Sequence, residues 1–248
     1  MKRCFHVLLP PLFLALLVQF SLEYIIFDED IVPFESIETD DENVQEVITS
    51  YHNHVRRHVD PPAANMQKMQ WSPVLAYSAK CWADLCYLNH STVDHRTIEG
   101  SPCGENILQS PVPLSWRTVI KNWEAEKEFL NFGEGAEDDQ VVAHYTQLVA
   151  DNTFEVGCAV ADCGEHYFYV CHYYTTGNEA ESLYDPYIIG EPCSKCETAC
   201  DGNKLCLNYC PFQDKATNCP YALHQGVCHW YAIRAMCKAS CNCKGKIK

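Results

Sequence analysis

The stretch Ala143-His144-Tyr145-Thr146-Gln147-Leu148-Val149 combines a candidate site residue with a segment of the expected core. An imidazole stands beside an aromatic ring and two hydrogen-bonding side chains, and an apolar run follows directly. Such a run is typical of a buried strand or a buried helix, and a site can form at the edge of either. A lone histidine is more often a satisfied core residue than a ligand, so a site here requires other residues to converge on His144.

The N-terminus has the layout of a secretory signal peptide. Lys2 and Arg3 precede an apolar run over 7–18, and Ser21 supplies a small residue near the expected cleavage point. The run of about 12 residues is too short to span a bilayer. We therefore predict a signal peptide over 1–21, no transmembrane segment, and a secreted, extracellular mature chain.

Cysteine usage agrees with export. The chain has 17 cysteines, of which Cys4 leaves with the signal peptide, so 16 remain for up to eight disulfides. Ten of them fall between Cys193 and Cys243, which predicts a separate disulfide-stapled module. The alternative is a metal cluster, because Cys193-x-x-Cys196 has the spacing of zinc ligands.

Charge is unevenly distributed along the chain. The formal net charge is −15, and ten acidic residues lie between Glu23 and Glu46 without a single Lys or Arg. From Cys193 onward, eight basic residues face three acidic ones. The acidic excess excludes nucleic acid as the expected partner, whereas the basic C-terminal region can meet an acidic surface.

The apolar pattern predicts helices interleaved with a few strands. A helix begins at Asn43 and ends before Pro61-Pro62, a second begins at Ser72-Pro73, and a third begins at Ser115-Trp116. Segments 156–160 and 167–173 are predicted to be two strands joined through Asp162-Cys163-Gly164-Glu165. This order favours a three-layer α+β domain, with an extended acidic arm over 22–43 before it and a linker over 179–192 after it.

Three further residues are candidates to converge on His144. They are His90 at the end of the second helix, Glu105 after a cysteine and a glycine, and Glu126 on the third helix. Two histidines and two glutamates suit a zinc site, and the same set suits general acid–base catalysis. Asn89-His90-Ser91 is also a glycosylation sequon, so Asn89 is a candidate glycan acceptor.

At this point the motifs resemble those of the cysteine-rich secretory proteins of the CAP superfamily, over about 43–248. The matching segments are Asn89-His90-Ser91, Cys103-Gly104-Glu105-Asn106, Trp123-x-x-Glu126, His144-Tyr145-Thr146-Gln147, Gly157-Cys158, Tyr169-Val170-Cys171-His172-Tyr173, Gly177-Asn178 and Cys241-x-Cys243. The resemblance implies an α-β-α sandwich CAP domain (44–178), a disulfide-rich hinge (193–208) and a small helical ion-channel-regulator module (209–248).

The resemblance also implies residue roles. His90 and His144 would bind Zn²⁺ weakly, without need of the metal for folding, and Glu105 and Glu126 would complete the cleft. The implied disulfides are Cys86–Cys163, Cys158–Cys171, Cys193–Cys200, Cys196–Cys206, Cys210–Cys243, Cys219–Cys237 and Cys228–Cys241.

Three positions depart from the family pattern. Tyr174 stands where the family has a cysteine that would pair with Cys103, and Cys81 is extra, so we expect an eighth bridge between Cys81 and Cys103. Ala150 replaces a tryptophan, which removes a large buried aromatic. Ala143 replaces a glycine, which adds a methyl group at an expected tight spot.

The segment 43–71 looks most like that of mammalian reproductive-tract members. The resemblance therefore implies a secreted, non-enzymatic protein that binds a sperm or egg surface protein or glycan, contributes to sperm maturation and sperm–egg interaction, and regulates a cation channel through 209–248. One alternative is a zinc- or carboxylate-dependent hydrolase that uses the four cleft residues. Another is a venom-type channel blocker with the same architecture.

Overall fold

A computed structural model describes residues 30–98, 100–210, 212, 214–244 and 246. The predicted signal peptide and residues 22–29 of the predicted arm lie outside these described residues. Within them, no helix has both the length and the apolar character needed to cross a membrane.

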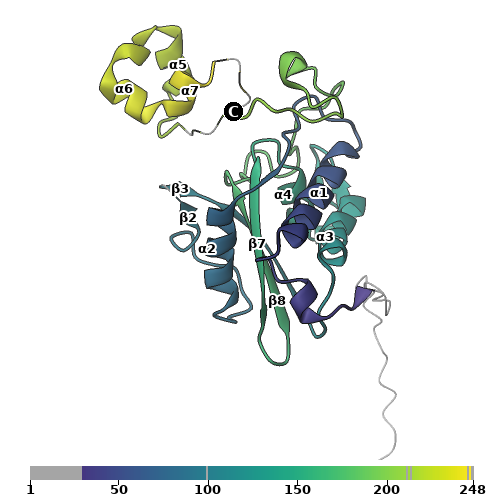
Figure 1. The fold of residues 1–248 in the computed structure, drawn as a ribbon. Helices are drawn as coiled ribbons and strands as arrows, with labels where there is room; N and C mark the ends of the chain where they lie inside the picture. Colours follow the sequence, from purple (N-terminus) through teal and green to yellow (C-terminus); the bar gives the residue numbers. More distant parts are fainter. Residues whose placement is uncertain (1–29, 99, 211, 213, 245, 247–248) are drawn as a thin grey trace, which may run out of the picture.

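The described chain contains helices and strands in a mixed order (Figure 1). In sequence they are η2 (Phe34–Ser36), α1 (Glu42–Arg57), β1 (Gln70–Trp71), α2 (Pro73–Ala83), β2 (Thr97–Ile98), β3 (Ser101–Pro102), β4 (Gly104–Ser110), α3 (Trp116–Ala125), η3 (Glu126–Phe129), β5 (Leu130–Asn131), β6 (Gly135–Ala136), η4 (Glu137–Asp139), α4 (Ala143–Val149), β7 (Glu155–Asp162), β8 (Tyr167–Tyr174), η5 (Glu197–Ala199), α5 (Cys219–His224), η6 (Val227–His229), α6 (Tyr231–Met236) and α7 (Lys238–Asn242).

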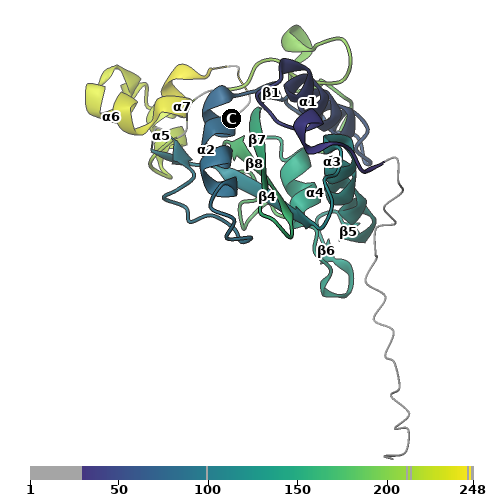
Figure 2. The same cartoon turned by 60° about the horizontal axis from the view of Figure 1, so that its bottom comes forward.

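A four-stranded sheet in the order β1-β7-β8-β4 forms the middle layer. β8 runs antiparallel to both β7 and β4, and the short β1 runs parallel to β7. Helix α2 covers one face of the sheet, while α1, α3 and α4 cover the other (Figures 1 and 2). The three-layer α+β prediction and the implied α-β-α sandwich are therefore confirmed.

The strands β7 and β8 are buried on both faces, and their side chains alternate between two cores. Val156, Cys158 and Val160 join the larger core under α1, α3 and α4, whereas Ala159 and Ala161 pack against α2. Small residues on the second face let α2 approach closely. At Gly157 a Cβ would lie 2.1 Å from the backbone nitrogen of Ala76, so only glycine fits under this helix.

Several predictions about elements need correction. The described part of the predicted extended arm packs onto the domain: Ile37 is buried, and its carbonyl accepts a hydrogen bond of 2.8 Å from the Trp116 indole. Residues 104–110, for which no strand was predicted, form the edge strand β4. Helix α2 ends at Ala83, earlier than the predicted stop near Asn89.

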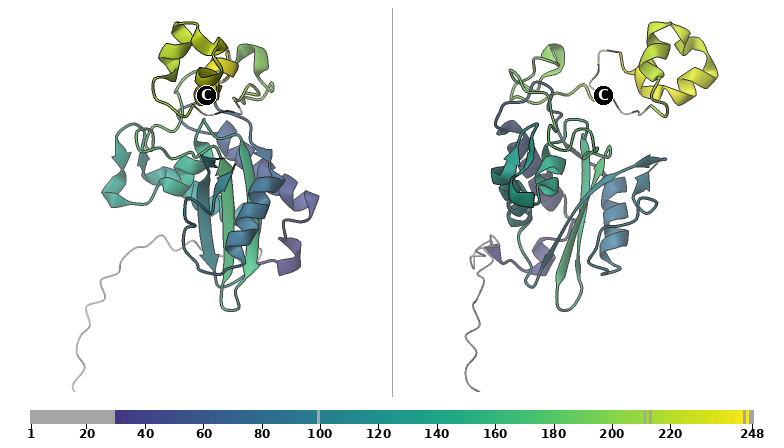
Figure 3. Two further views of the ribbon diagram at one scale, coloured as in Figure 1. Left: turned by 90° about the vertical axis from the view of Figure 1, so that its left-hand side faces the viewer. Right: turned by 180° about the vertical axis from the view of Figure 1, so that it is seen from behind.

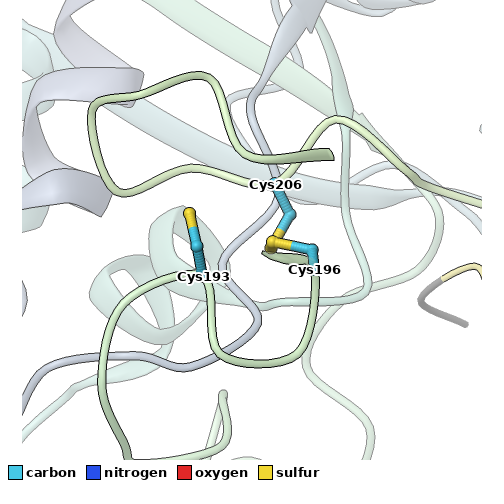
Figure 4. A group of neighbouring side chains, drawn as sticks. All are labelled: Cys193, Cys196 and Cys206. Atoms are coloured by element: carbon cyan, nitrogen blue, oxygen red, sulfur yellow. A yellow bond between two sulfur atoms is a disulfide. The ribbon is translucent and has the colours of Figure 1, made fainter. Parts of the chain in front are cut away.

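The seven implied disulfides are all present, two within the CAP-like part and five in the C-terminal region. Cys193, Cys196 and Cys206 place their sulfur atoms within 4.8 Å of one another. Figure 4 shows the bond that joins Cys196 to Cys206. Because Cys193 is also bonded, to Cys200, these sulfurs are disulfides and not the thiolates that a zinc cluster requires.

The predicted Cys81–Cys103 bridge is wrong, since both cysteines are free. Cys81 belongs to α2 and is partly exposed, whereas Cys103 is buried and its thiol points to the Ser101 carbonyl at 3.9 Å. The two side chains therefore lie in different surroundings. Burial raises the pKa of the Cys103 thiol to about 11.

A buried neutral histidine makes the stability of the fold dependent on pH. His52 donates from Nδ1 to the Ile48 carbonyl (2.8 Å) and accepts at Nε2 from the Tyr173 hydroxyl (3.0 Å). Burial lowers the pKa of His52 to about 4. Between pH 6.5 and 4 the unfolded chain thus binds a proton that the folded chain refuses, so folding stability falls as the pH falls through this window.

We expect the burial of His52 to lower the free energy of unfolding by about 2 kcal/mol when the pH falls from 7 to 5. Guanidinium unfolding at the two pH values measures the loss, and a His52→Gln variant should show a loss smaller by that amount. The exposed His58, mutated to Gln, is the matched control and should retain the wild-type slope. An unchanged slope in His52→Gln would contradict the assignment.

Candidate functional site

Helix α2, its following loop and strand β4 build one half of the candidate site. Glu105 on β4 has a side chain only 1% exposed, and its Oε1 accepts from His90 Nδ1 at 2.7 Å and from the Ser91 backbone N–H at 2.9 Å. Its Oε2 accepts from His172 Nε2 at 3.0 Å. Burial alone would raise the pKa of Glu105, but the hydrogen bonds from His172, His90 and Ser91 outweigh it and hold the pKa well below its usual range.

His172 is directly opposite Glu105 in the β4–β8 register, so strand pairing fixes this contact. Its side chain is fully buried, and its Nδ1 lies 3.0 Å from the Ser78 hydroxyl of α2. Burial lowers the pKa of His172, which makes the ring a neutral donor to the Glu105 carboxylate. His172 therefore orients Glu105, which in turn orients His90.

The junction of α3 and η3, together with the start of α4, builds the other half. Glu126 Oε1 accepts from His144 Nδ1 at 2.5 Å. Its Oε2 accepts from the backbone N–H groups of His144 (2.9 Å) and Tyr145 (3.1 Å). No side chain of the preceding Val142 caps α4, so Glu126 satisfies the free amides of this helix start. The Trp123 ring lies nearly parallel to the His144 ring, with 6.3 Å between centroids.

The edge strand β4 brings the two halves together. Glu105 turns toward the α2 side of the sheet, while its neighbour Asn106 turns to the other side and donates to the His144 carbonyl at 3.0 Å. A cleft of about 350 Å³ opens over this edge. It is lined by His90, Arg96, Cys103, Gly104, Glu105, Asn106, Val141, Ala143, His144, Gln147, Thr176 and Asn178.

Three of the four predicted residues therefore line the cleft. The fourth, Glu126, is outside the lining and orients His144 by accepting its Nδ1 hydrogen bond. Both histidines have the same local chemistry: each donates from Nδ1 to a carboxylate and keeps Nε2 as a potential ligand atom. This is the carboxylate–histidine arrangement that orients imidazoles for a metal ion, so the residues present fit Zn²⁺.

Sequence reasoning gave no role at the site to His172 or Gln147. His172 lay in a predicted strand, but nothing in that run of apolar and aromatic residues indicated that its ring contacts Glu105. Gln147 is 1% exposed and fills the space between Gly104 and Gly177, where a Cβ at either glycine would meet its amide within 2.4 Å. No sequence signal identified Gln147, because its two glycine neighbours are distant in sequence and meet it only in the fold.

The departures around His144 have different consequences from those expected. Ala143 is exposed at the mouth of the cleft, so the prediction that its methyl group enters a tight spot is wrong. Ala150 is buried at the end of α4, and the effect of its small side chain on packing there stays a prediction. The predicted glycan acceptor Asn89 is exposed beside His90, and its use as an acceptor stays a prediction.

The fold and the cysteine pattern define a protein with an α-β-α domain, an edge cleft carrying two histidines, and a small disulfide-rich C-terminal module. Comparison with known proteins agrees. The family model described as "Cysteine-rich secretory protein family" matches residues 49–173, and the model described as "Crisp" matches 193–248.

The chain belongs to the cysteine-rich secretory protein family. It is 41% identical to cysteine-rich secretory protein 1 of Mus musculus over 217 residues, covering 86% of this chain and 88% of that protein. Among solved structures it is similar to NaASP2, crystallised with Zn²⁺ (28% identity, TM-score 0.56, 72% of this chain and 98% of that one). It is also similar to the Schistosoma mansoni venom allergen-like protein 4 (29% identity, TM-score 0.51, 61% and 97%).

We expect the two cleft histidines to act together on a metal ion. His144→Ala removes one of the two imidazoles and should abolish zinc binding at the cleft. Glu126→Gln keeps the size of the side chain but withdraws the charge behind His144, and should weaken zinc affinity roughly 10- to 100-fold. Isothermal titration of the chelator-treated chain with Zn²⁺ measures both effects.

Glu128→Gln is the matched control, because Glu128 is an exposed carboxylate two residues further along η3. Its zinc affinity should equal that of the wild type. If His144→Ala bound zinc as tightly as the wild type, the cleft would not be the zinc site.

Proposed function

We propose that this chain is a secreted, non-enzymatic binding protein of the reproductive tract. It associates with sperm through a surface protein or glycan, contributes to sperm maturation and sperm–egg interaction, and regulates a cation channel through 209–248. Family membership and the 41% identity to the mouse protein support the first part. The surface of the C-terminal module is the single observation that supports the second part, the regulation of a cation channel.

That module exposes large aromatic side chains among basic ones. Tyr231 is 89% exposed, Tyr221 67% and Trp230 62%. These exposed fractions are high, because tyrosine and tryptophan rings are usually at least partly buried. Residues 209–248 contain six Lys or Arg and a single acid, Asp214, which is bonded to the Ser240 backbone and hydroxyl. Aromatic anchors with a positive field suit the acidic outer mouth of a cation channel.

The state of the two carboxylates supports a binding role over hydrolysis. Both oxygens of Glu105 accept hydrogen bonds from His90, Ser91 and His172. Both oxygens of Glu126 accept from His144 and from backbone amides. A general base needs a free oxygen facing the water it deprotonates, and these two carboxylates act as orienting groups instead.

We expect the full-length chain to alter cation currents recorded from whole sperm, and the effect to depend on the exposed rings. The double change Trp230→Ala and Tyr231→Ala removes the two rings without touching a disulfide. It should reduce the effect on the current at least roughly tenfold, as expected for hot-spot aromatics. Patch-clamp recording with purified protein provides the measurement.

Tyr184→Ala is the matched control, because Tyr184 is a 39% exposed tyrosine outside the module. Currents unaffected by the wild-type chain would refute the channel part, while saturable binding of labelled chain to sperm would still test the first part separately. Peptide hydrolysis that disappears in His144→Ala would instead support the hydrolase alternative.

A further inference from the structure

Helix α2 is apolar on its outer face as well as on the face that packs against the sheet. Val74 is 59% exposed, Tyr77 73% and Leu85 46%, and Cys81 between them is partly exposed. Their spacings of three and four residues place them on one line along the helix and its last turn. A helix that is apolar all round is normally covered on both sides. In Figure 3, right, α2 lies at the outside of the molecule.

A free thiol occupies the middle of this line. Among the described cysteines, all except Cys81 and Cys103 are in disulfides, and Cys103 is 1% exposed. Seven disulfides indicate that the chain matures under oxidising conditions. An accessible unpaired cysteine in such a protein favours pairing between molecules.

The exposed row of α2 residues can pack against the same row of a second copy when the two helices run antiparallel. If a two-fold axis passes beside Cys81, Tyr77 lies four residues before the axis and Leu85 four residues after it. Each Tyr77 then packs on the Leu85 of the second copy, as a two-fold interface requires.

Charge is self-complementary as well. Lys80 and Asp84 form an ion pair of 3.1 Å along one flank of the line. In the antiparallel pair, Lys80 of one copy and Asp84 of the other are offset by two residues along the helix axis, or about 3 Å. Each Lys80 therefore also reaches the second copy's Asp84. The face carries no net charge that would repel its own copy.

We propose that a second copy of this chain covers α2, in a two-fold dimer closed by a Cys81–Cys81 disulfide. A small-molecule disulfide such as oxidised glutathione serves as the oxidant. The Cys81 thiolate of one chain attacks it, forming a mixed disulfide and releasing one glutathione thiol. The Cys81 thiolate of the second chain attacks the protein sulfur of the mixed disulfide and releases the other glutathione thiol.

The test incubates the purified full-length chain with oxidised glutathione and follows it by non-reducing electrophoresis and light scattering. We expect a dimer that reverts to monomer with dithiothreitol, and peptide mapping should find Cys81 linked to Cys81. Cys81→Ser should remain monomeric on the gel. Cys103→Ser, the matched control, should dimerise like the wild type.

The apolar face is tested apart from the thiol. Tyr77→Lys places a charge against Leu85 of the second copy and should slow dimer formation roughly tenfold. Val47→Lys makes the same change at an exposed position of α1, on the other side of the sheet, and should leave the rate unchanged. Equal rates for these two variants, a Cys81–Cys103 bridge, or a monomer that carries glutathione on Cys81 would each overturn the proposal.

Discussion

The cleft depends on how a helix of seven residues is held at its two ends. Helix α4 is too short to be stable alone, since isolated helices need about 12–15 residues. Glu126 binds the amides at its start, and the buried guanidinium of Arg56 binds the Leu148 carbonyl at its end at 2.9 Å. Arg56 also binds the carbonyls of Gln67 and Thr153. Opposite charges at the matching ends of the helix dipole thus fix where His144 stands.

The edge position of β4 explains why the two histidines reach a common cleft. One strand presents Glu105 to the α2 face and Asn106 to the α4 face, so segments on opposite sides of the sheet meet where the sheet ends. An interior strand would have neighbours on both sides and no room for a cleft. Each histidine is then oriented by a carboxylate that has no free oxygen left. This architecture pre-organises two imidazoles, which is what a binding site for a metal ion or a polar ligand needs.

The sequence was informative where one physical signal dominated. Apolar spacing located α1 and α3, and runs of apolar and aromatic residues located β7 and β8, because all four elements bury much of their surface. β4 was missed because it begins with Gly104, Glu105 and Asn106, which have no apolar side chain, and their burial depends on partners that are distant in sequence. The four candidate site residues were named from their chemistry, but their scattered spacing did not show that they converge, and the family motifs supplied that argument. The even number of cysteines in the mature chain suggested a Cys81–Cys103 bridge. A count does not show which cysteines lie close together, and only the fold shows that α2 turns Cys81 outward.

Aromatic rings pack at the position where the family resemblance implied a bridging cysteine. Tyr174, at that position, meets the Phe154 ring edge-on at 5.6 Å, and Phe154 stacks on Tyr209 at 4.1 Å. This column connects the end of β8 with the first residue of the C-terminal module. Only the Tyr174–Phe154 pair involves the substituted position, and such a pair contributes about 0.5–1.5 kcal/mol, less than the about 2–4 kcal/mol typical of a disulfide. The chemistry differs as well: the Cys103 thiol is buried and unpaired, while the Cys81 thiol lies on an apolar outer face where another molecule can reach it.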